Sequence, residues 1–255
     1  MNTLEHVLEC SVVICATRST VFRFFKDSKR FAEWWGAGSH VDGRPGGALS
    51  IRYPDGTTAS GTIQEMVDDE RIVFSYGYDA GQPVPPGSTR VTVTLHEHPE
   101  GTLVTLRHEL ADPALRDTHV QGWKYQLALF ANVAARAQHA EVASLVDRYF
   151  SLWAEPDAGL RRAELEAVAT EAVVFRDAYG STRGRADLET HIAAVQHYMP
   201  GVRLRREGAV RQCQGTALAD WTAAGTGGEA RGRGSNVFDL SPDGRIARVV
   251  GLWGG

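Results

Sequence analysis

The stretch TRVTVTLHEHPEGTLVTLRHE, from Thr89 to Glu109, decides the fold of the first half of this chain. Its first arm alternates valine and leucine with threonine and histidine. After a turn signal at Pro99-Glu100-Gly101, its second arm alternates in the same way. Strict alternation of this kind is typical of a strand with one buried face. The sequence therefore predicts a β-hairpin whose apolar face is covered by another element.

The covering element is predicted to be a long helix after the hairpin, beginning near Asp112-Pro113. Its apolar residues recur at three- and four-residue steps and are Leu115, Trp123, Leu127, Phe130 and Ala134. Turn signals upstream separate further strand patterns at residues 7–14, 49–53, 61–67 and 71–78. We expect an α+β domain in which an antiparallel sheet is covered by this helix on one face.

A small, polar stretch at residues 136–140 is interpreted as a junction, which predicts domains at residues 1–138 and 139–255. The second half first shows helical patterns, including an apolar stripe at Val142, Val146, Tyr149 and Trp153. The remaining elements are a helix over 160–169, a strand over 172–177, a helix from Arg185 to about 199, and strands over 203–212, 216–224, 229–240 and 246–252. Helices followed by a curved antiparallel sheet predict a second α+β domain.

The composition excludes several classes of protein. The 255 residues include 43% hydrophobic and 23% charged residues with a net charge of −4, which are ordinary globular values. Neither half is basic enough to predict a nucleic-acid partner. No apolar run approaches the roughly 20 residues of a membrane span. Without a signal-peptide pattern, and with three scattered cysteines (Cys10, Cys15 and Cys213), we expect reduced thiols and a cytoplasmic location.

Two family resemblances follow from short motifs. The first set is Trp34-Trp35-Gly36, Arg44-Pro45-Gly46-Gly47, Glu70-Arg71-Ile72-Val73-Phe74, the strand Thr89–Leu95 and Gly122-Trp123. With these motifs, residues 5–138 resemble the START-like (SRPBCC) superfamily, in the branch named after the activator of the heat-shock-protein ATPase. The resemblance implies a helix-grip fold, with a cavity between the sheet and the long helix.

The second set is Tyr149 with Trp153, Val173-Val174-Phe175-Arg176-Asp177, Gly184-Arg185, Pro200-Gly201, Trp221 and Asp243-Gly244-Arg245-Ile246. With it, residues 140–255 resemble the SnoaL-like polyketide cyclase branch of the nuclear-transport-factor-two-like fold. The resemblance implies a cone-shaped α+β barrel and, because such domains commonly pair through their sheets, a homodimer.

The first-half cavity would be lined by side chains that face the long helix. Its candidate ligand-binding residues are Trp35, Phe74, Tyr76, Tyr78, Val93, His108, Trp123 and Leu127. An aromatic cavity with a few polar groups favours a flat apolar ligand. The alternative is that these side chains simply fill a core. His108, the titratable group on the apolar face, is interpreted as a hydrogen-bonded core histidine rather than an acid–base group.

The second half carries a chemical hypothesis centred on Asp177, which alternation places on the same strand face as Val173 and Phe175. A carboxylate on an apolar face is costly unless it is paired or protonated. Resemblance to ketosteroid isomerases implies that Asp177 is the base, with Tyr149 and Asn236 as donors to an enolate oxygen. The alternative is that Asp177 caps the turn at 178–181 or pairs with Arg176 or Arg183. Candidate ligand-binding residues here are Trp153, Phe175, Trp221 and Phe238.

The pair His96 and His98 lies on the polar side of its strand, and no third ligand accompanies it, so we expect neither a metal nor a cofactor. The preferred function is the binding of a small hydrophobic or aromatic molecule, with a stress or metabolic role. One alternative is a cofactor-independent isomerase or cyclase in the second domain. Another is a regulatory or chaperone-associated module without enzymatic activity. Whether the chain is an enzyme stays open.

Overall fold

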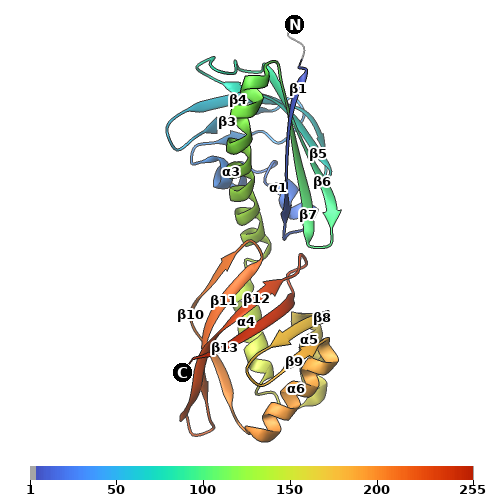
Figure 1. The fold of residues 1–255 in the computed structure, drawn as a ribbon, viewed down its shortest axis with the longest axis vertical. Helices are drawn as coiled ribbons and strands as arrows, with labels where there is room; N and C mark the ends of the chain where they lie inside the picture. The colour runs from blue at the N-terminus through green and yellow to red at the C-terminus, as the bar shows by residue number, and fades with distance from the viewer. Residues whose placement is uncertain (1–3, 255) are drawn as a thin grey trace. The chain divides into compact units, whose positions relative to one another are not determined.

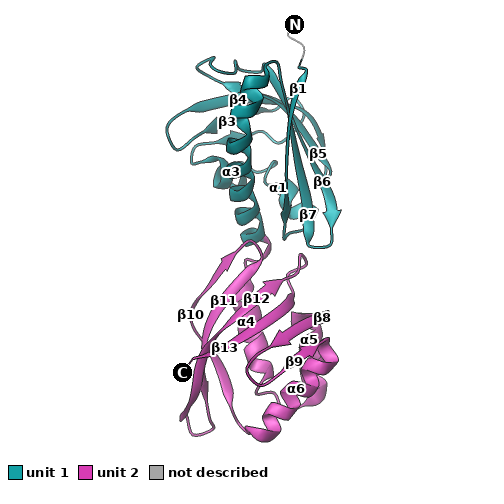
Figure 2. Ribbon diagram, in the orientation of Figure 1, with its two compact units in different colours: residues 1–137 teal, residues 138–255 magenta. Residues whose placement is uncertain are grey.

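The computed structural model describes residues 4–254, which form two compact units that divide between Ala137 and Gln138 (Figure 2). Both units combine helices with a large sheet, so the predicted α+β fold class is confirmed (Figure 1). None of the helices in residues 4–254 has the length and apolar composition that crossing a membrane requires. Each unit is described by itself below.

In unit 1, the described residues form a seven-stranded sheet covered by the long helix α3. Its elements are β1 (His6–Ile14), α1 (Arg18–Arg23), α2 (Ser28–Trp35), β2 (His40–Val41), β3 (Ala48–Arg52), β4 (Thr58–Val67), β5 (Arg71–Tyr78), β6 (Thr89–His98), β7 (Gly101–Leu110) and α3 (Pro113–Gln138). The strand order is β1-β7-β6-β5-β4-β3-β2, and each neighbouring pair is antiparallel. The predicted hairpin is the β6–β7 pair, in which Val91 lies opposite His108.

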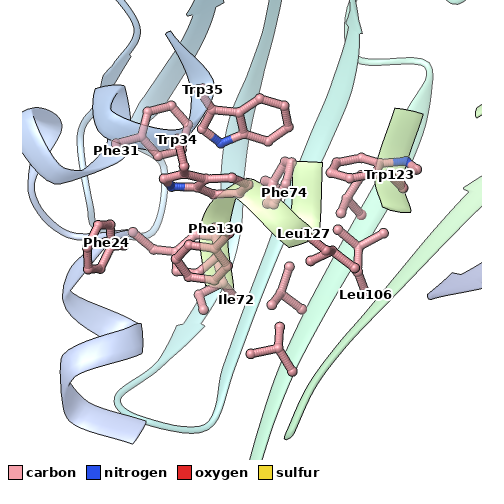
Figure 3. Packing of buried hydrophobic residues seen from close by; sticks show 14 of the residues in the cluster. Phe24, Phe31, Trp34, Trp35, Ile72, Phe74, Leu106, Trp123, Leu127 and Phe130 are labelled. Carbon is pink, nitrogen blue, oxygen red and sulfur yellow. The ribbon is translucent and has the colours of Figure 1, made fainter. Parts of the chain in front are cut away.

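The core of unit 1 lies between the sheet, α3 and the short helices α1 and α2. Figure 3 shows the indole of Trp34 between Trp35 and Phe130, with ring centroids 4.4 and 4.5 Å away. Phe24 and Phe25 contact Phe130 edge to face at 5.6 and 5.5 Å. Aromatic pairs at these separations stabilise a core beyond their buried area. This cluster fixes α2 against α3.

The end of α2 is set by Gly36. At the other end of α2, Asp27 is the N-cap residue directly before the helix. Its carboxylate accepts hydrogen bonds from the backbone of Lys29 and Arg30. Gly36 has φ of 128°, and a Cβ at this position would collide with the carbonyl oxygen of Arg52. Only glycine fits such a close approach. The chain therefore leaves the helix directly after Trp35 and holds that side chain over the sheet.

In unit 2, helices precede and cover a six-stranded sheet. Its elements are α4 (Val142–Leu152), α5 (Ala158–Val168), β8 (Ala169–Arg176), β9 (Ser181–Arg183), α6 (Arg185–Tyr198), β10 (Arg203–Cys213), β11 (Thr216–Ala224), β12 (Ala230–Leu240) and β13 (Ile246–Gly254). The strand order among the described residues is β10-β11-β12-β13-β8-β9, so β10 and β9 are the edges of an open, curved sheet. The apolar core lies between this sheet and α4, α5 and α6.

The sheet of unit 2 differs from the expected antiparallel one at a single pair. The last strand, β13, runs parallel to β8, with Val249 opposite Phe175. This arrangement arises because β8 follows the first helices and pairs with the strand that ends the chain. The strands β2 and β9 were not predicted, because two or three residues are too few to show an alternating pattern.

Candidate functional site

Unit 1 contains a cavity of about 350 Å³ between the sheet and α3. Its buried end is formed mainly by aromatic side chains, and its exposed residues form an opening. The lining residues are Trp35, Tyr53, Asp55, Thr57, Tyr76, Tyr78, Pro83, Thr118, His119, Gly122, Trp123 and Gln126. Both the volume and the aromatic lining are typical of sites for small organic molecules.

Three elements bring the aromatic walls together. Trp35 ends α2, Tyr76 lies on β5, and Trp123 projects from α3. The ring centroid of Trp123 is 5.6 Å from that of Trp35 and 6.2 Å from that of Tyr76. Tyr78, two residues along β5 from Tyr76, contacts the ring of Tyr53 at 6.4 Å. Trp35 and Trp123 meet edge to face, the other two pairs are tilted, and all five rings belong to side chains that line the cavity.

His108 lies behind this wall and is fully buried. Its Nδ1 accepts a hydrogen bond from Nε1 of Trp123 at 3.0 Å, so the proton of the neutral ring is on Nε2. That atom donates to Oγ1 of Thr89 at 2.8 Å, and Thr89 in turn donates to the carbonyl oxygen of Tyr76 at 2.8 Å. Burial first, and the neighbouring His119 second, lower the pKa of His108 to about 3. His108 is therefore a neutral residue that positions Trp123 and Tyr76.

The tyrosine hydroxyls of the cavity are uncharged. The hydroxyls of Tyr53 and Tyr76 are hydrogen-bonded at 2.8 Å. Burial raises the pKa of both phenols far above the ordinary value for tyrosine. Gln126, also buried, donates its amide to the carbonyl oxygen of Trp34. The inner end of the cavity thus offers neutral polar groups between aromatic faces.

His119 supplies a hydrogen-bond acceptor without a partner. Its Nδ1 is 2.7 Å from the carbonyl oxygen of Leu115, which is an acceptor only, so Nδ1 carries a proton. In the neutral ring Nε2 is then an acceptor. This nitrogen is buried and forms no hydrogen bond with any residue in the described range 4–254. The ring contacts Tyr78 and His108 at 6.1 and 5.6 Å.

The structure separates the predicted ligand-binding residues of the first half into two groups. Trp35, Tyr76, Tyr78 and Trp123 line the cavity. Four others do not line it, and the expectation that they would is corrected: Phe74, Val93, His108 and Leu127. Phe74, Val93 and His108 lie on strands of the sheet and Leu127 lies on α3, and all four are buried in the interior.

Sequence reasoning missed Tyr53, His119 and Gln126. Tyr53 directly follows the alternating strand β3, and Gln126 carries an amide on an apolar helix face. His119 precedes Trp123 by one helical turn, which is the spacing that places two side chains on the same face. That spacing is the signal by which His119 could have been found.

Unit 2 contains a smaller pocket of about 40 Å³. Its lining is more apolar than that of unit 1, with one carboxylate and one amide. The lining residues are Trp153, Phe175, Asp177, Tyr179, Val195, Met199, Val202, Leu204, Trp221, Asn236, Gly251 and Trp253. A volume of this size holds a water molecule or two, but not a bicyclic molecule.

Asp177 caps the turn that follows β8. Its Oδ1 accepts hydrogen bonds from the backbone of Tyr179 and Gly180 at 2.8 and 2.9 Å. Its Oδ2 is 3.5 Å from Nε1 of Trp253, at the limit of hydrogen bonding. The turn-capping alternative for Asp177 is therefore observed, and one carboxylate oxygen remains weakly bonded at the pocket.

Asn236 lies beside Asp177, on the other side of Gly251. A Cβ at Gly251 would lie 3.1 Å from the Cβ of Asp177 and 3.3 Å from Oδ1 of Asn236, so glycine leaves room for both side chains. Oδ1 of Asn236 accepts a hydrogen bond from Nε1 of Trp221 at 2.9 Å. Its Nδ2 is the group that would donate to a ligand.

Tyr149 is fully buried, and its hydroxyl forms no hydrogen bond within the part of the chain that the structure describes. Burial raises the pKa of Tyr149 well above its ordinary value, the neighbouring indole of Trp153 offsets part of this rise, and the charge of Asp177 adds to it. Trp153, one turn along from Tyr149, contacts it edge to face at 6.2 Å. An unpaired buried hydroxyl is rare in native proteins and indicates a site for a water or ligand oxygen.

Five of the residues predicted as sites in the second half line the pocket: Asp177, Asn236, Trp153, Phe175 and Trp221. Tyr149 and Phe238 are not among its lining residues. Both are buried and contact each other at a ring separation of 5.5 Å. Trp253 and Gly251, on the last strand, were missed because the parallel pairing of β13 with β8 was not predicted.

Residues 4–254 contain no cluster of three or more His, Cys, Asp or Glu side chains in a geometry that would hold a metal ion. His98 accepts a hydrogen bond from the backbone of Glu100 at 3.1 Å, which explains its place at the hairpin turn.

Comparison with known families gives one match for each unit. The model described as activator of Hsp90 ATPase homolog 1-like protein matches residues 15–135. The SnoaL-like domain model matches residues 146–249. A comparison with curated proteins finds no match.

Solved structures show similarity to single units. An AHSA1-like protein from Rhizobium etli is 30% identical over 51% of this chain and 82% of its own, with a TM-score of 0.41. The Aha1 dimer from Colwellia psychrerythraea is 13% identical over 48% of this chain and 90% of its own, with a TM-score of 0.43. A SnoaL-like family protein from Agrobacterium tumefaciens is 24% identical over 47% of this chain and 99% of its own, with a TM-score of 0.43.

The two family matches follow each other without overlap and correspond to the two units of the fold. The chain therefore joins a domain of the activator of Hsp90 ATPase homolog 1-like family, at residues 15–135, to a SnoaL-like domain, at residues 146–249.

Proposed function

We propose that unit 1 binds a small, flat, hydrophobic or aromatic molecule in its cavity. The observation that carries this proposal is a space of about 350 Å³ walled by Trp35, Tyr76, Tyr78 and Trp123. A core that merely packed would be filled to the density of organic crystals. The hydrogen bonds of His108 support a binding role, because they hold two of these walls in fixed positions.

A substitution at Gly122 is the most direct test of ligand binding in this cavity. It lies inside α3, where glycine is less favourable than alanine by about 0.5–1 kcal/mol. It also lines the cavity, and a Cβ at this position would meet nothing within 4 Å. The substitution Gly122→Leu therefore adds a side chain at the opening without a clash. We expect it to weaken the binding of 2-naphthol at least about tenfold, because the opening is obstructed, while stability stays equal or rises by about 0.5–1 kcal/mol.

Isothermal titration calorimetry of the full-length protein measures the affinity, and thermal unfolding measures the stability. Gln121→Leu is the matched control, since Gln121 is exposed on the same helix and does not line the cavity. Equal affinity of the wild type and Gly122→Leu for the ligand would refute binding at this site.

A second candidate function is proton transfer next to a carbonyl in unit 2. The observation in its favour is the unpaired, buried hydroxyl of Tyr149 within the electrostatic reach of Asp177. In this hypothesis Asp177 removes the proton, and Tyr149 and Asn236 donate hydrogen bonds to the enolate oxygen. The small volume of the pocket and the capping role of Asp177 place it behind ligand binding in unit 1.

The two roles of Asp177 predict different mutational effects. Asp177→Asn retains an oxygen for the turn, so we expect a stability change below about 0.5 kcal/mol, whereas Asp177→Ala loses both backbone hydrogen bonds and costs about 1–2 kcal/mol. In the proton-transfer hypothesis, Asp177→Asn also loses the exchange of the α-protons of acetone, a ketone of four heavy atoms, for deuterium, measured by NMR. If wild type and Asp177→Asn exchange these protons at the same rate, Asp177 is not a base.

A homodimer remains a prediction for this chain, as does a regulatory role. Domains of the two families are compatible with binding or isomerase-type and cyclase-type modules, and neither family fixes a ligand.

A further inference from the structure

The charges of the residues that line the cavity of unit 1 restrict the class of ligand that the cavity can bind. Among the twelve lining residues, all within the described chain, none is lysine or arginine, and Asp55 is the one carboxylate. Asp55 is exposed at the opening, where its carboxylate accepts a hydrogen bond from the backbone of Thr57 at 2.9 Å. An anion entering the cavity would lose water, would find no lysine or arginine as a countercharge, and would pass this carboxylate. Carboxylates and phosphates are therefore poor ligands.

The buried end also disfavours a cation. Tyr53 and Tyr76 have raised pKa values and stay neutral, and Gln126 is an amide. A cation placed there would lose its hydration and would have no buried carboxylate beside it. Aromatic faces offset part of this cost, but they bind a neutral ring without incurring it. A neutral ligand fits the site best.

His119 adds a specific requirement to this neutral site. Its Nδ1 proton is held by the carbonyl oxygen of Leu115, which leaves Nε2 of the neutral ring as an acceptor. That nitrogen has no hydrogen-bond partner among residues 4–254, although it is buried in a side chain that lines the cavity. A buried acceptor without a partner is destabilising, so a ligand gains affinity by donating a hydrogen bond to it.

We propose that the cavity selects a neutral hydroxyaryl molecule, whose phenolic O–H donates to Nε2 of His119 while its ring packs among Trp35, Tyr78 and Trp123. This inference rests on the proposed function and names the ligand class of that site. The phenolic hydroxyl satisfies the unpaired nitrogen, and the flat ring matches the aromatic walls. No covalent step is involved.

Three probes of nearly the same size test the proposal: 2-naphthol, its methyl ether 2-methoxynaphthalene, and the anion 2-naphthoate. Affinities are measured by calorimetry on the full-length protein at neutral pH. We expect 2-naphthol to bind at least about tenfold more tightly than either of the others, because only it is both neutral and a donor. The variant His119→Phe keeps an aromatic ring and removes the acceptor. In it, the preference for naphthol over the ether should disappear, while the affinity for the ether changes less than about twofold.

The outcomes separate this inference from the proposal on which it rests. Equal binding of 2-naphthol and its ether to the wild type leaves the aromatic cavity intact and overturns the role of His119. A preference that persists in His119→Phe also overturns that role. Tighter binding of 2-naphthoate overturns the selection of neutral ligands. If none of the three binds, the proposed function itself fails. Near-ultraviolet circular dichroism and thermal unfolding establish that His119→Phe is folded.

Discussion

Unit 1 is expected to lose roughly 2.3 kcal/mol of unfolding free energy between pH 6.5 and pH 4.5 through His108 alone. The folded state holds this imidazole neutral, with its pKa lowered to about 3 by burial and by His119. In the unfolded chain the ring takes up a proton near pH 6.5. The unfolded state therefore binds more protons in this range, so stability falls as pH falls and levels off near pH 3.

The groups around His108 explain why the folded state resists protonation. Trp123 donates to Nδ1, so a proton on that nitrogen would break this hydrogen bond. Thr89 already accepts from Nε2, and the nearby ring of Tyr76 is neutral. Since no carboxylate is hydrogen-bonded to the ring among residues 4–254, no countercharge stabilises an imidazolium.

Urea titrations followed by hydrogen-exchange mass spectrometry measure the effect, because peptides of β6 and β7 report on unit 1 separately. His108→Gln is the control, since an amide keeps an acceptor and a donor but does not titrate. The wild type should lose roughly 2.3 kcal/mol more than His108→Gln over this pH range. Parallel losses in the two proteins would show that His108 is not the group that titrates.

Arg161→Met is expected to destabilise unit 2 by about 3–5 kcal/mol. The side chain of Arg161 is 5% exposed, and its Nη2 lies 2.8 Å from Oε1 of Glu189 on α6. Its Nη1 donates to the carbonyl oxygens of Glu155 and Pro156 at 2.8 and 3.0 Å and to Oε1 of Gln196 at 3.0 Å. Removing the cation leaves a largely buried carboxylate and several acceptors without partners, which is costlier than the loss of an exposed ion pair.

The hydrogen bonds around Arg161 extend through Gln196 to a residue that lines the pocket of unit 2. The amide of Gln196 donates to the carbonyl oxygens of Trp153 and Glu155 at 3.1 and 2.8 Å. Trp153 lines the pocket, so Gln196 of α6, which also accepts from Arg161 of α5, helps to hold one of the pocket walls.

The urea dependence of hydrogen exchange in α6 peptides measures the effect of Arg161→Met. Arg162→Met, at an exposed position of the same helix, is the control and should change stability by less than about 0.5 kcal/mol. A loss below about 1 kcal/mol in Arg161→Met would mean that the buried ion pair contributes no more than a surface one.

Periodicity predicted most of the fold, because each long strand and helix buries one face. The strand expected over 71–78 and the one expected over 216–224 are β5 and β11 with the same bounds. The position of β13 next to β8 could not be predicted. This parallel pairing joins segments about 75 residues apart and leaves no local pattern in the sequence. The burial of Arg161 could not be predicted from the sequence either, because its partners lie on a loop and on another helix.

The sites were only partly predictable for a related reason. Alternation placed Phe74, Tyr76 and Tyr78 on one face of a single strand, and that is where they lie. It could not show that Phe74 is covered while the two tyrosines border a cavity. That difference depends on how far the curved sheet stands from α3 at each residue, and distance between elements is not a property of a single strand's sequence.

The central claim is that an aromatic ligand binds in the cavity of unit 1, which Trp35, Tyr78 and Trp123 line. Intermolecular nuclear Overhauser effects between 2-naphthol and isotope-labelled full-length protein test it most directly, because they locate the ligand. The account predicts effects to the indole protons of Trp35 and Trp123 and to the ring of Tyr78, all weaker in Gly122→Leu at the same subsaturating naphthol concentration. Effects confined to Trp221 and Trp253 of unit 2, or none at a saturating concentration of naphthol, would contradict it.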